Sequence, residues 1–445
     1  MNSTVKRRPV LTAGIVGISA VTLVLAACSG SGSSSSSTSG AAGKSAANLT
    51  FLGINENKTV EATLTTLSQN DCKAENAAQP LKVTKQAQGT LDQQLQLLAG
   101  QGALPQLFIA ANSPALTSQL AQQGSIQDVS AALDKVGASD AILPAAKSVI
   151  ENLYNGKDLV LPTELNIEGI WYNKKLLSDN GIAVPTTWSQ LTDAFAKLKA
   201  AGIQPISQAG KGGDGWGVTR WVGDYIARDL GPTAMQDVRD GKAKLTDAEY
   251  VKAADAVANL GKQGYFGPSP TSIDYTTALN TFLTGKAAFI YMGSWAVSDF
   301  TSTTENKIGA DNVGFMHFPA VDGGKGSADQ MPANVGAAVA ISAKGFANDP
   351  ATQAWVGCIA KNYGTVALRD SGQVTGFKVN GSVNVSPLST LVQDEIGKVS
   401  TSILWFEAYF SAKATTTSQN DGGLLASGQL SGADFMSQVQ ADLGS

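Results

Sequence analysis

Residues 285–298 read GKAAFIYMGSWAVS, and this stretch combines a helix end, an apolar strand and a tryptophan at a turn. Gly285 is typical of the end of a helix, here expected over 276–283. The apolar run that follows contains β-favouring residues and suits a buried strand. Ser294 is a good N-cap, so the next helix is expected to begin at Trp295. A tryptophan therefore stands at a strand-to-helix turn, where loops commonly carry function.

The segment after residue 48 shows the same alternation of strand and helix. Short apolar strands, each followed by a helical pattern, are expected at 49–54, 81–85 and 107–110. Such alternation indicates a parallel sheet covered by helices on both faces. Ligands of such sheets bind at the carboxyl ends of the strands. Asn55 and Glu56 follow the first strand and Asn112 follows the third, so these polar side chains are candidates for a binding site.

The N-terminus carries the pattern of an export signal. Positive residues at 6–8 precede a mostly apolar run over 10–25, and small residues follow, so residues 1–27 are expected to be a signal peptide. The sequence Leu-Ala-Ala-Cys that ends at Cys28 resembles a bacterial lipobox, in which this cysteine carries the lipid. The alternative is an ordinary signal peptide with a chance cysteine. Residues 28–47 are rich in Ser and Gly and suit a flexible tether, so we expect a lipid-anchored protein on the extracytoplasmic face of the cell membrane.

The composition argues against several other classes of protein. The net charge is −4 and no basic run lies beyond the N-terminus, which argues against nucleic-acid binding. The single histidine, His317, lies where a strand runs into a turn and is expected to be structural. Without HExxH, CxxC or a cysteine cluster we expect no metal site and no cofactor. Cys72 and Cys358 form a disulfide or remain two separate buried thiols.

Several segments together resemble a known family. Leu161-Pro162 is followed by IWYNKKL at 170–176, VPTTW occupies 184–188, and LTGKAA at 283–288 precedes GSW at 293–295. In this order and spacing the motifs are similar to those of the extracellular solute-binding proteins of sugar ABC transporters, the group that includes maltose-binding protein. The resemblance extends over nearly all of the chain that follows the tether.

The resemblance implies an α/β fold with two lobes, each a mostly parallel sheet flanked by helices. The first lobe would comprise 48–162 and 335–380, and the second 168–320 and 388–445. Strands that cross between the lobes would lie near 162–169, 318–334 and 375–387. Cys72 and Cys358 would then both belong to the first lobe, which makes their pairing testable. We expect a monomer.

The resemblance also implies that the tryptophan at the turn binds sugar. One face of a pyranose ring consists of C–H groups, which an aromatic ring can cover while polar groups bind the hydroxyls. By motif position, the expected stacking residues are Trp216, Trp295 and Trp405, with Trp221 as a fourth. The expected hydroxyl-binding residues are Asn55, Glu56, Asn112 and Asn166, and further candidates are Glu164, Glu168, Asn334 and Glu407. Asn112 and Asn166 are amides where the maltose-type pattern often has carboxylates, so the identity of the sugar stays open.

The function implied is that of a lipid-anchored receptor, not an enzyme. It would capture a mono- or oligosaccharide by closure of the two lobes and deliver it to ABC permease subunits. One alternative is an exported glycan-active enzyme, which needs two carboxylates facing each other across the scissile bond. Another is the same fold with a non-sugar solute, such as a peptide or a polyamine.

Overall fold

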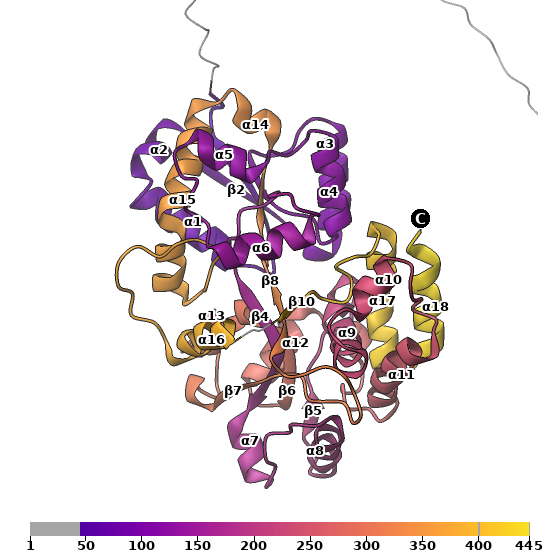
Figure 1. The fold of residues 1–445 in the computed structure, drawn as a ribbon. Helices are drawn as coiled ribbons and strands as arrows, with labels where there is room; N and C mark the ends of the chain where they lie inside the picture. The colour runs from indigo at the N-terminus through magenta and orange to yellow at the C-terminus, as the bar shows by residue number, and fades with distance from the viewer. Residues whose placement is uncertain (1–44, 399–400, 445) are drawn as a thin grey trace, which may run out of the picture. The chain divides into compact units, whose positions relative to one another are not determined.

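The computed structural model describes residues 45–398 and 401–444 (Figure 1). The expected signal peptide, Cys28 and nearly all of the expected tether lie outside the described residues. Two β-sheets, each surrounded by its own helices, organise the described chain. None of the helices described is long and apolar enough to cross a membrane.

The first sheet has the strand order β2-β1-β3-β9. β1 pairs in parallel with β2 and β3, and β9 runs antiparallel to β3. Its strands are β1 Leu49–Ile54, β2 Leu81–Gln86, β3 Leu107–Ile109 and β9 Val339–Ile341. Because β9 comes from much later in the chain than the others, this lobe is built from two separate segments.

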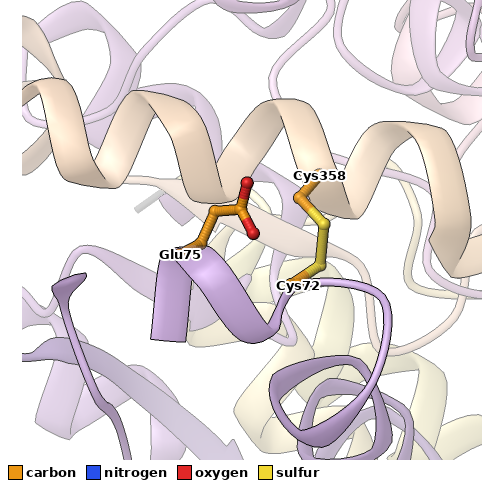
Figure 2. Close-up of side chains that lie close together, drawn as sticks. All are labelled: Cys72, Glu75 and Cys358. Atoms are coloured by element: carbon orange, nitrogen blue, oxygen red, sulfur yellow. A yellow bond between two sulfur atoms is a disulfide. The ribbon is translucent and has the colours of Figure 1, made fainter. Parts of the chain in front are cut away.

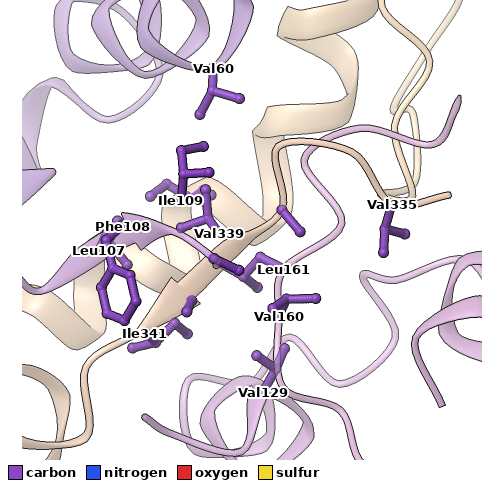
Figure 3. Close-up of a cluster of buried hydrophobic side chains, with 14 of the residues drawn as sticks. Val60, Leu107, Phe108, Ile109, Val129, Val160, Leu161, Val335, Val339 and Ile341 are labelled. Atoms are coloured by element: carbon purple, nitrogen blue, oxygen red, sulfur yellow. The ribbon is translucent and has the colours of Figure 1, made fainter. Parts of the chain in front are cut away.

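Eight helices and one short 3-10 turn belong to the first lobe. They are α1 Thr59–Gln69, α2 Lys73–Ala78, η1 Gln88–Thr90, α3 Leu91–Gly100, α4 Pro114–Gln122, α5 Val129–Lys135, α6 Pro144–Leu153, α14 Ala343–Ala347 and α15 Pro350–Ser371. In Figure 1 the orange α14 and α15 lie among the violet helices from the N-terminal segment. Figure 3 shows the shared core, in which Val60 of α1, Ile109 of β3 and Val339 of β9 lie close together.

The second sheet has the order β10-β8-β4-β6-β5, and β7 also pairs with β4. Its strands are β4 Asn166–Asn173, β5 Gln204–Ile206, β6 Ala287–Gly293, β7 Val313–Met316, β8 Gln330–Asn334 and β10 Thr401–Ile403. The expectation of a mostly parallel sheet is wrong for this lobe, because the central strand β4 runs antiparallel to β6, β7 and β8. Alternation of strand and helix in the sequence predicts parallel neighbours, but here β4 enters from the first lobe and runs against the strands that follow it.

Strand β6 contains the apolar run of the 285–298 stretch, and it is buried on both faces. Phe289 and Tyr291 belong to one hydrophobic cluster, whereas Ile290 and Met292 belong to a second cluster on the other face. Successive side chains of a strand point to opposite faces, so a strand between two cores is apolar at every position. This burial explains the uninterrupted apolar run in the sequence.

The second lobe contains the remaining helices and turns of the described chain. They are α7 Lys174–Asp179, α8 Trp188–Ala200, η2 Gly212–Gly215, α9 Trp216–Leu230, α10 Ala234–Arg239, α11 Ala248–Lys262, η3 Pro270–Ser272, α12 Tyr275–Leu283, η4 Ser294–Ala296, α13 Val297–Thr301, η5 Ala310–Asn312, α16 Pro387–Lys398, α17 Ala412–Ala426 and α18 Gly432–Asp442. Helix α17 packs on α9 and α11, and α18 packs on α11 and α17, so the C-terminal segment belongs to this lobe.

The chain passes between the lobes at neighbouring places. Leu161 forms a bridge with Val339 of the first sheet, and a few residues later Asn166 of β4 pairs with Asn334 of β8. The second crossing follows β8, later than the expected 318–334, because β8 stays in the second sheet through its pairing with β4 and β10. The two-lobed α/β fold expected from the sequence is confirmed.

A disulfide joins Cys72 to Cys358 within the first lobe (Figure 2). Cys72 directly precedes α2, and Cys358 lies in α15, so the bond links the two chain segments that build this lobe. Glu75 lies beside the two sulfur atoms. Because both sulfurs are used in the disulfide, this group offers no thiolate for a metal ion.

Candidate ligand-binding site

A cavity of about 980 Å³, partly open to solvent, is lined by residues of both lobes. The first lobe contributes the segments that follow β1 and β3, and the second contributes α9, α12, η4 and the segment after β10. The carboxyl ends of the parallel strands β1 and β3 therefore face this cavity, as expected for an α/β sheet.

One wall of the cavity is aromatic. Trp216, at the start of α9, lies edge-on to Trp295 with 5.6 Å between ring centroids, and 6.4 Å from the ring of Tyr275. Trp405 follows β10 and lines the same cavity. Trp295 and Trp405 are half-buried, so part of each ring is accessible from the cavity. These rings offer the flat apolar surfaces that the C–H face of a sugar can cover.

Gly293 and Ser294 set the position of Trp295. The Trp295 ring folds back over Gly293, and a Cβ atom at Gly293 would lie closer to the ring than carbon atoms can approach. The Ser294 hydroxyl donates to Asn166 Oδ1 at 3.0 Å and accepts from the Ile167 N–H at 3.3 Å. Ser294 is therefore not the N-cap expected from the sequence. Its hydroxyl instead fastens the turn to β4, and a short 3-10 turn precedes α13.

The first lobe supplies a polar rim. Glu56 Oε2 accepts the Gln88 backbone N–H at 2.9 Å, and Asn112 Nδ2 donates to the Gln88 carbonyl at 2.7 Å. The backbone N–H of Asn112 donates to Asp92 Oδ1 at 2.7 Å. All three rim side chains, Glu56, Gln88 and Asn112, are half-buried and line the cavity. The rim is thus held by hydrogen bonds before any ligand is present.

Glu164 is a buried carboxyl group at the base of the cavity. Its Oε1 accepts from Asn57 Nδ2 at 2.6 Å and its Oε2 accepts from Asn166 Nδ2 at 2.8 Å. Burial raises the pKa of Glu164, and the two amide hydrogen bonds oppose this rise. Because Asn57 comes from the first lobe and Asn166 from β4, the carboxyl group connects the first lobe to a crossing strand.

Two buried polar atoms of cavity-lining residues have no partner. They are Nε1 of Trp216 and Oδ1 of Asn334, whose side chains are 7% and 6% exposed. Asn334 Nδ2 donates to Glu168 instead. An unpaired buried polar group costs free energy, so such atoms deserve an explanation. A hydroxyl group can accept a hydrogen bond from an indole N–H or donate one to an amide oxygen, so it is chemically suited to either atom.

The structure brings together most of the residues expected from the sequence. Glu56, Asn112, Trp216, Trp295 and Trp405 line the cavity. Further candidates that line it are Glu164 and Asn334.

Three expected ligand-binding residues lie elsewhere. Asn55 is exposed and lines a smaller adjoining cavity. Asn166 is fully buried and is used by Glu164, Ser294 and Gln373. Trp221 is fully buried in the hydrophobic core between Phe266, Tyr291 and Phe318, so its indole is not brought to the cavity.

Two further ring residues lie outside the cavity. Trp355 is fully buried in the first-lobe core. His317 lies outside the cavity, where Nδ1 is 2.6 Å from the Ala328 carbonyl and Nε2 is 2.7 Å from Glu395. These contacts give the histidine a structural position.

The cavity also contains residues that sequence reasoning missed, of which Arg220 and Tyr275 are the most important. Arg220 lies four residues after Trp216 in α9 and thus on the same helix face, a signal that was present in the sequence. Asn57 belongs to the polar cluster that follows β1. Gln419 of α17 also lines the cavity, but no local pattern distinguishes it.

Comparison with known proteins identifies the family. The model of the bacterial extracellular solute-binding protein family matches residues 73–362, most of the chain. The chain therefore belongs to this family.

Curated relatives and solved structures agree with this assignment. A probable sugar-binding periplasmic protein of Brucella melitensis is 27% identical over 260 residues, which cover 53% of this chain and 59% of the relative. The chain thus spans about three-fifths of the length of this relative. A solved chitin oligosaccharide binding protein is 26% identical, with a TM-score of 0.77 over 88% of this chain and 97% of the other. A structure from a study of xylan utilization by a thermophilic bacterium has a TM-score of 0.78 at 21% identity, covers 88% and 99%, and shows the fold alone.

Proposed function

We propose that the protein is a carbohydrate receptor that binds its ligand in the cavity between the lobes and delivers it to an ABC permease. The observation that carries the proposal is that one cavity is lined both by the aromatic rings of Trp216, Trp295 and Trp405 and by the polar side chains of Glu56 and Asn112. Apolar rings for the C–H faces and forked polar groups for the hydroxyls are what a sugar requires. The printed names of the Brucella relative and of the chitin oligosaccharide binding protein support this ligand class.

The proposed mechanism is differential binding without chemistry. A ligand that contacts both lobes favours the closed arrangement over the open one. Glu164 supports binding rather than hydrolysis, because each of its oxygens already accepts a hydrogen bond from an amide side chain. A lipid on Cys28 would keep the receptor beside the permease.

A screen of mono-, di- and oligosaccharides by thermal shift and calorimetry tests the proposal, since a ligand of the folded state raises the melting temperature. We expect at least one sugar to bind the wild-type protein, and we expect Trp295→Ala to lower the affinity for that sugar. The matched control is Trp188→Ala, because Trp188 is also half-buried but does not line the cavity. No sugar hit across the screen, or equal losses in both variants, would overturn the proposal. Mass spectrometry of the mature N-terminus tests the lipid.

A further inference from the structure

Arg220 lies beside two tryptophans of the aromatic wall. Among the side chains that line the cavity in the described chain it is the one cation, and it is 9% exposed. The central carbon of its guanidinium lies 5.3 Å from the ring centroid of Trp216 and 5.6 Å from that of Trp405. A cation within about 6 Å of a ring centroid is attracted to the face of the ring. Arg220 thus supports two of the three tryptophans at once.

Two buried carboxylates hold the guanidinium in place. Arg220 Nε donates to Glu168 Oε2 at 2.7 Å, and Nη1 donates to Glu407 Oε2 at 2.8 Å. Both glutamate side chains are fully buried. Burial alone would lower the pKa of Arg220, but the charges of Glu168 and Glu407 outweigh it and the pKa is raised.

Glu168 and Glu407 have further partners that keep them fixed. Glu407 accepts from the hydroxyls of Thr219 and of Ser418, and Glu168 accepts from Asn334. These partners are uncharged. One cation is therefore paired with two carboxylates, so these three side chains together are formally net negative.

The remaining charged groups of the cavity are also acidic. Glu56 lies at the rim and Glu164 at the base, and the cavity lining of the described chain offers no second cation. An anionic ligand group placed there would lose its hydration and would meet no cation except Arg220, which is already paired with two carboxylates. Like charges brought together in this way disfavour binding of the acidic ligand.

We propose that Arg220 is a positioning residue whose pairing with Glu168 and Glu407 fixes Trp216 and Trp405 and makes the cavity selective for uncharged saccharides over acidic ones. This inference rests on the proposed function, and it names the class of sugar that the same cavity takes. In this proposal Arg220 acts on the ligand through the two tryptophans that it contacts.

The test compares pairs of ligands that differ in one charge. Suitable pairs are galactose with galacturonate and cellobiose with cellobiouronate, each titrated into the full mature protein at neutral pH and physiological salt. We expect the neutral member of a binding pair to bind at least about 100-fold more tightly. Equal or tighter binding of the acidic member would overturn the inference while leaving the proposed function intact. Binding of no member of any pair would instead contradict the proposed function.

Glu407→Gln tests the role of the paired carboxylates. This variant removes one negative charge that balances Arg220, so we expect the preference for the neutral ligand to narrow by about tenfold. If Glu407 had a merely structural role, the substitution would lower the affinity for both ligands by the same factor. An unchanged ratio of the two affinities would therefore overturn the inference. The control is Glu249→Gln, an exposed position on α11, where the ratio should not change. Circular dichroism checks that both variants fold. If Glu407→Gln does not fold, the comparison of neutral with acidic ligands on the wild-type protein decides the inference by itself.

Discussion

Gly293→Ala should lower the affinity for sugar because it displaces the indole ring of Trp295. The added methyl group would overlap the six-membered ring of Trp295, at its Cζ3 and Cε3 atoms. Carbon atoms in contact lie about 3.5–4.0 Å apart, so the ring must move by about 1.5 Å. The backbone at Gly293 has φ −92°, which alanine adopts without strain, so the overlap with the ring is the whole perturbation.

The structure sets the size of the effect. Crowding a packed side chain costs about 1–3 kcal/mol, which should appear as a lower free energy of unfolding. Loss of a well-placed tryptophan from a binding site costs about 2 kcal/mol or more, so the Kd should rise about 30-fold. Calorimetric titration with the sugar found by screening measures the second quantity, and urea unfolding measures the first.

A double-mutant cycle makes the prediction specific. In the Trp295→Ala background there is no ring to displace, so Gly293→Ala should add little to the loss of affinity. Gly100→Ala is the control, because a Cβ at Gly100 would meet nothing within 4 Å. Unchanged affinity in Gly293→Ala, or losses that add in the double variant, would refute the reasoning.

Three further predictions concern groups away from the ligand. Replacing Cys72 and Cys358 by serine should lower the free energy of unfolding by about 2–5 kcal/mol and leave affinity unchanged, as urea titrations and calorimetry would show. Trp221→Phe should destabilise the protein by about 1–3 kcal/mol with no change in affinity, because the indole is buried in the core; a large loss of affinity would contradict its placement. Burial raises the pKa of Asp224 to about 7, so the folded state holds a proton that the unfolded state releases between about pH 4 and 7. Wild-type stability should therefore fall relative to Asp224→Asn as the pH rises through this window, which unfolding curves at several pH values would measure.

Local patterns in the sequence predicted those strands that are marked by an apolar run in the sequence. The strand over 49–54 was predicted with the bounds that the structure shows, and the apolar run of β6 was predicted as a buried strand. The antiparallel pairing of β4 could not be predicted in this way, because it depends on which distant strands meet β4. The partners of Arg220 present the same difficulty, since Glu168 and Glu407 come from segments far from α9.

The two tryptophans of α9 show what closer reading of the sequence could have achieved. Trp216 and Trp221 are five residues apart, which on an α-helix places them about 140° from each other. Both therefore cannot face one cavity, and the structure places Trp216 at the cavity and Trp221 in the core. Arg220, one turn from Trp216, shares its face. The helical spacing from Trp216 thus predicts Arg220, and not Trp221, as a second residue of α9 at the site.

The most direct measurement of the central claim is a crystal structure of the protein with the first sugar that binds in solution. We predict an uncharged sugar in the cavity, with a ring stacked on the indole of Trp295, Trp216 or Trp405. We also predict that Trp216 Nε1 donates a hydrogen bond to one of its hydroxyls. A sugar bound outside the cavity, or inside it without contact to any of the three indoles, would contradict the account.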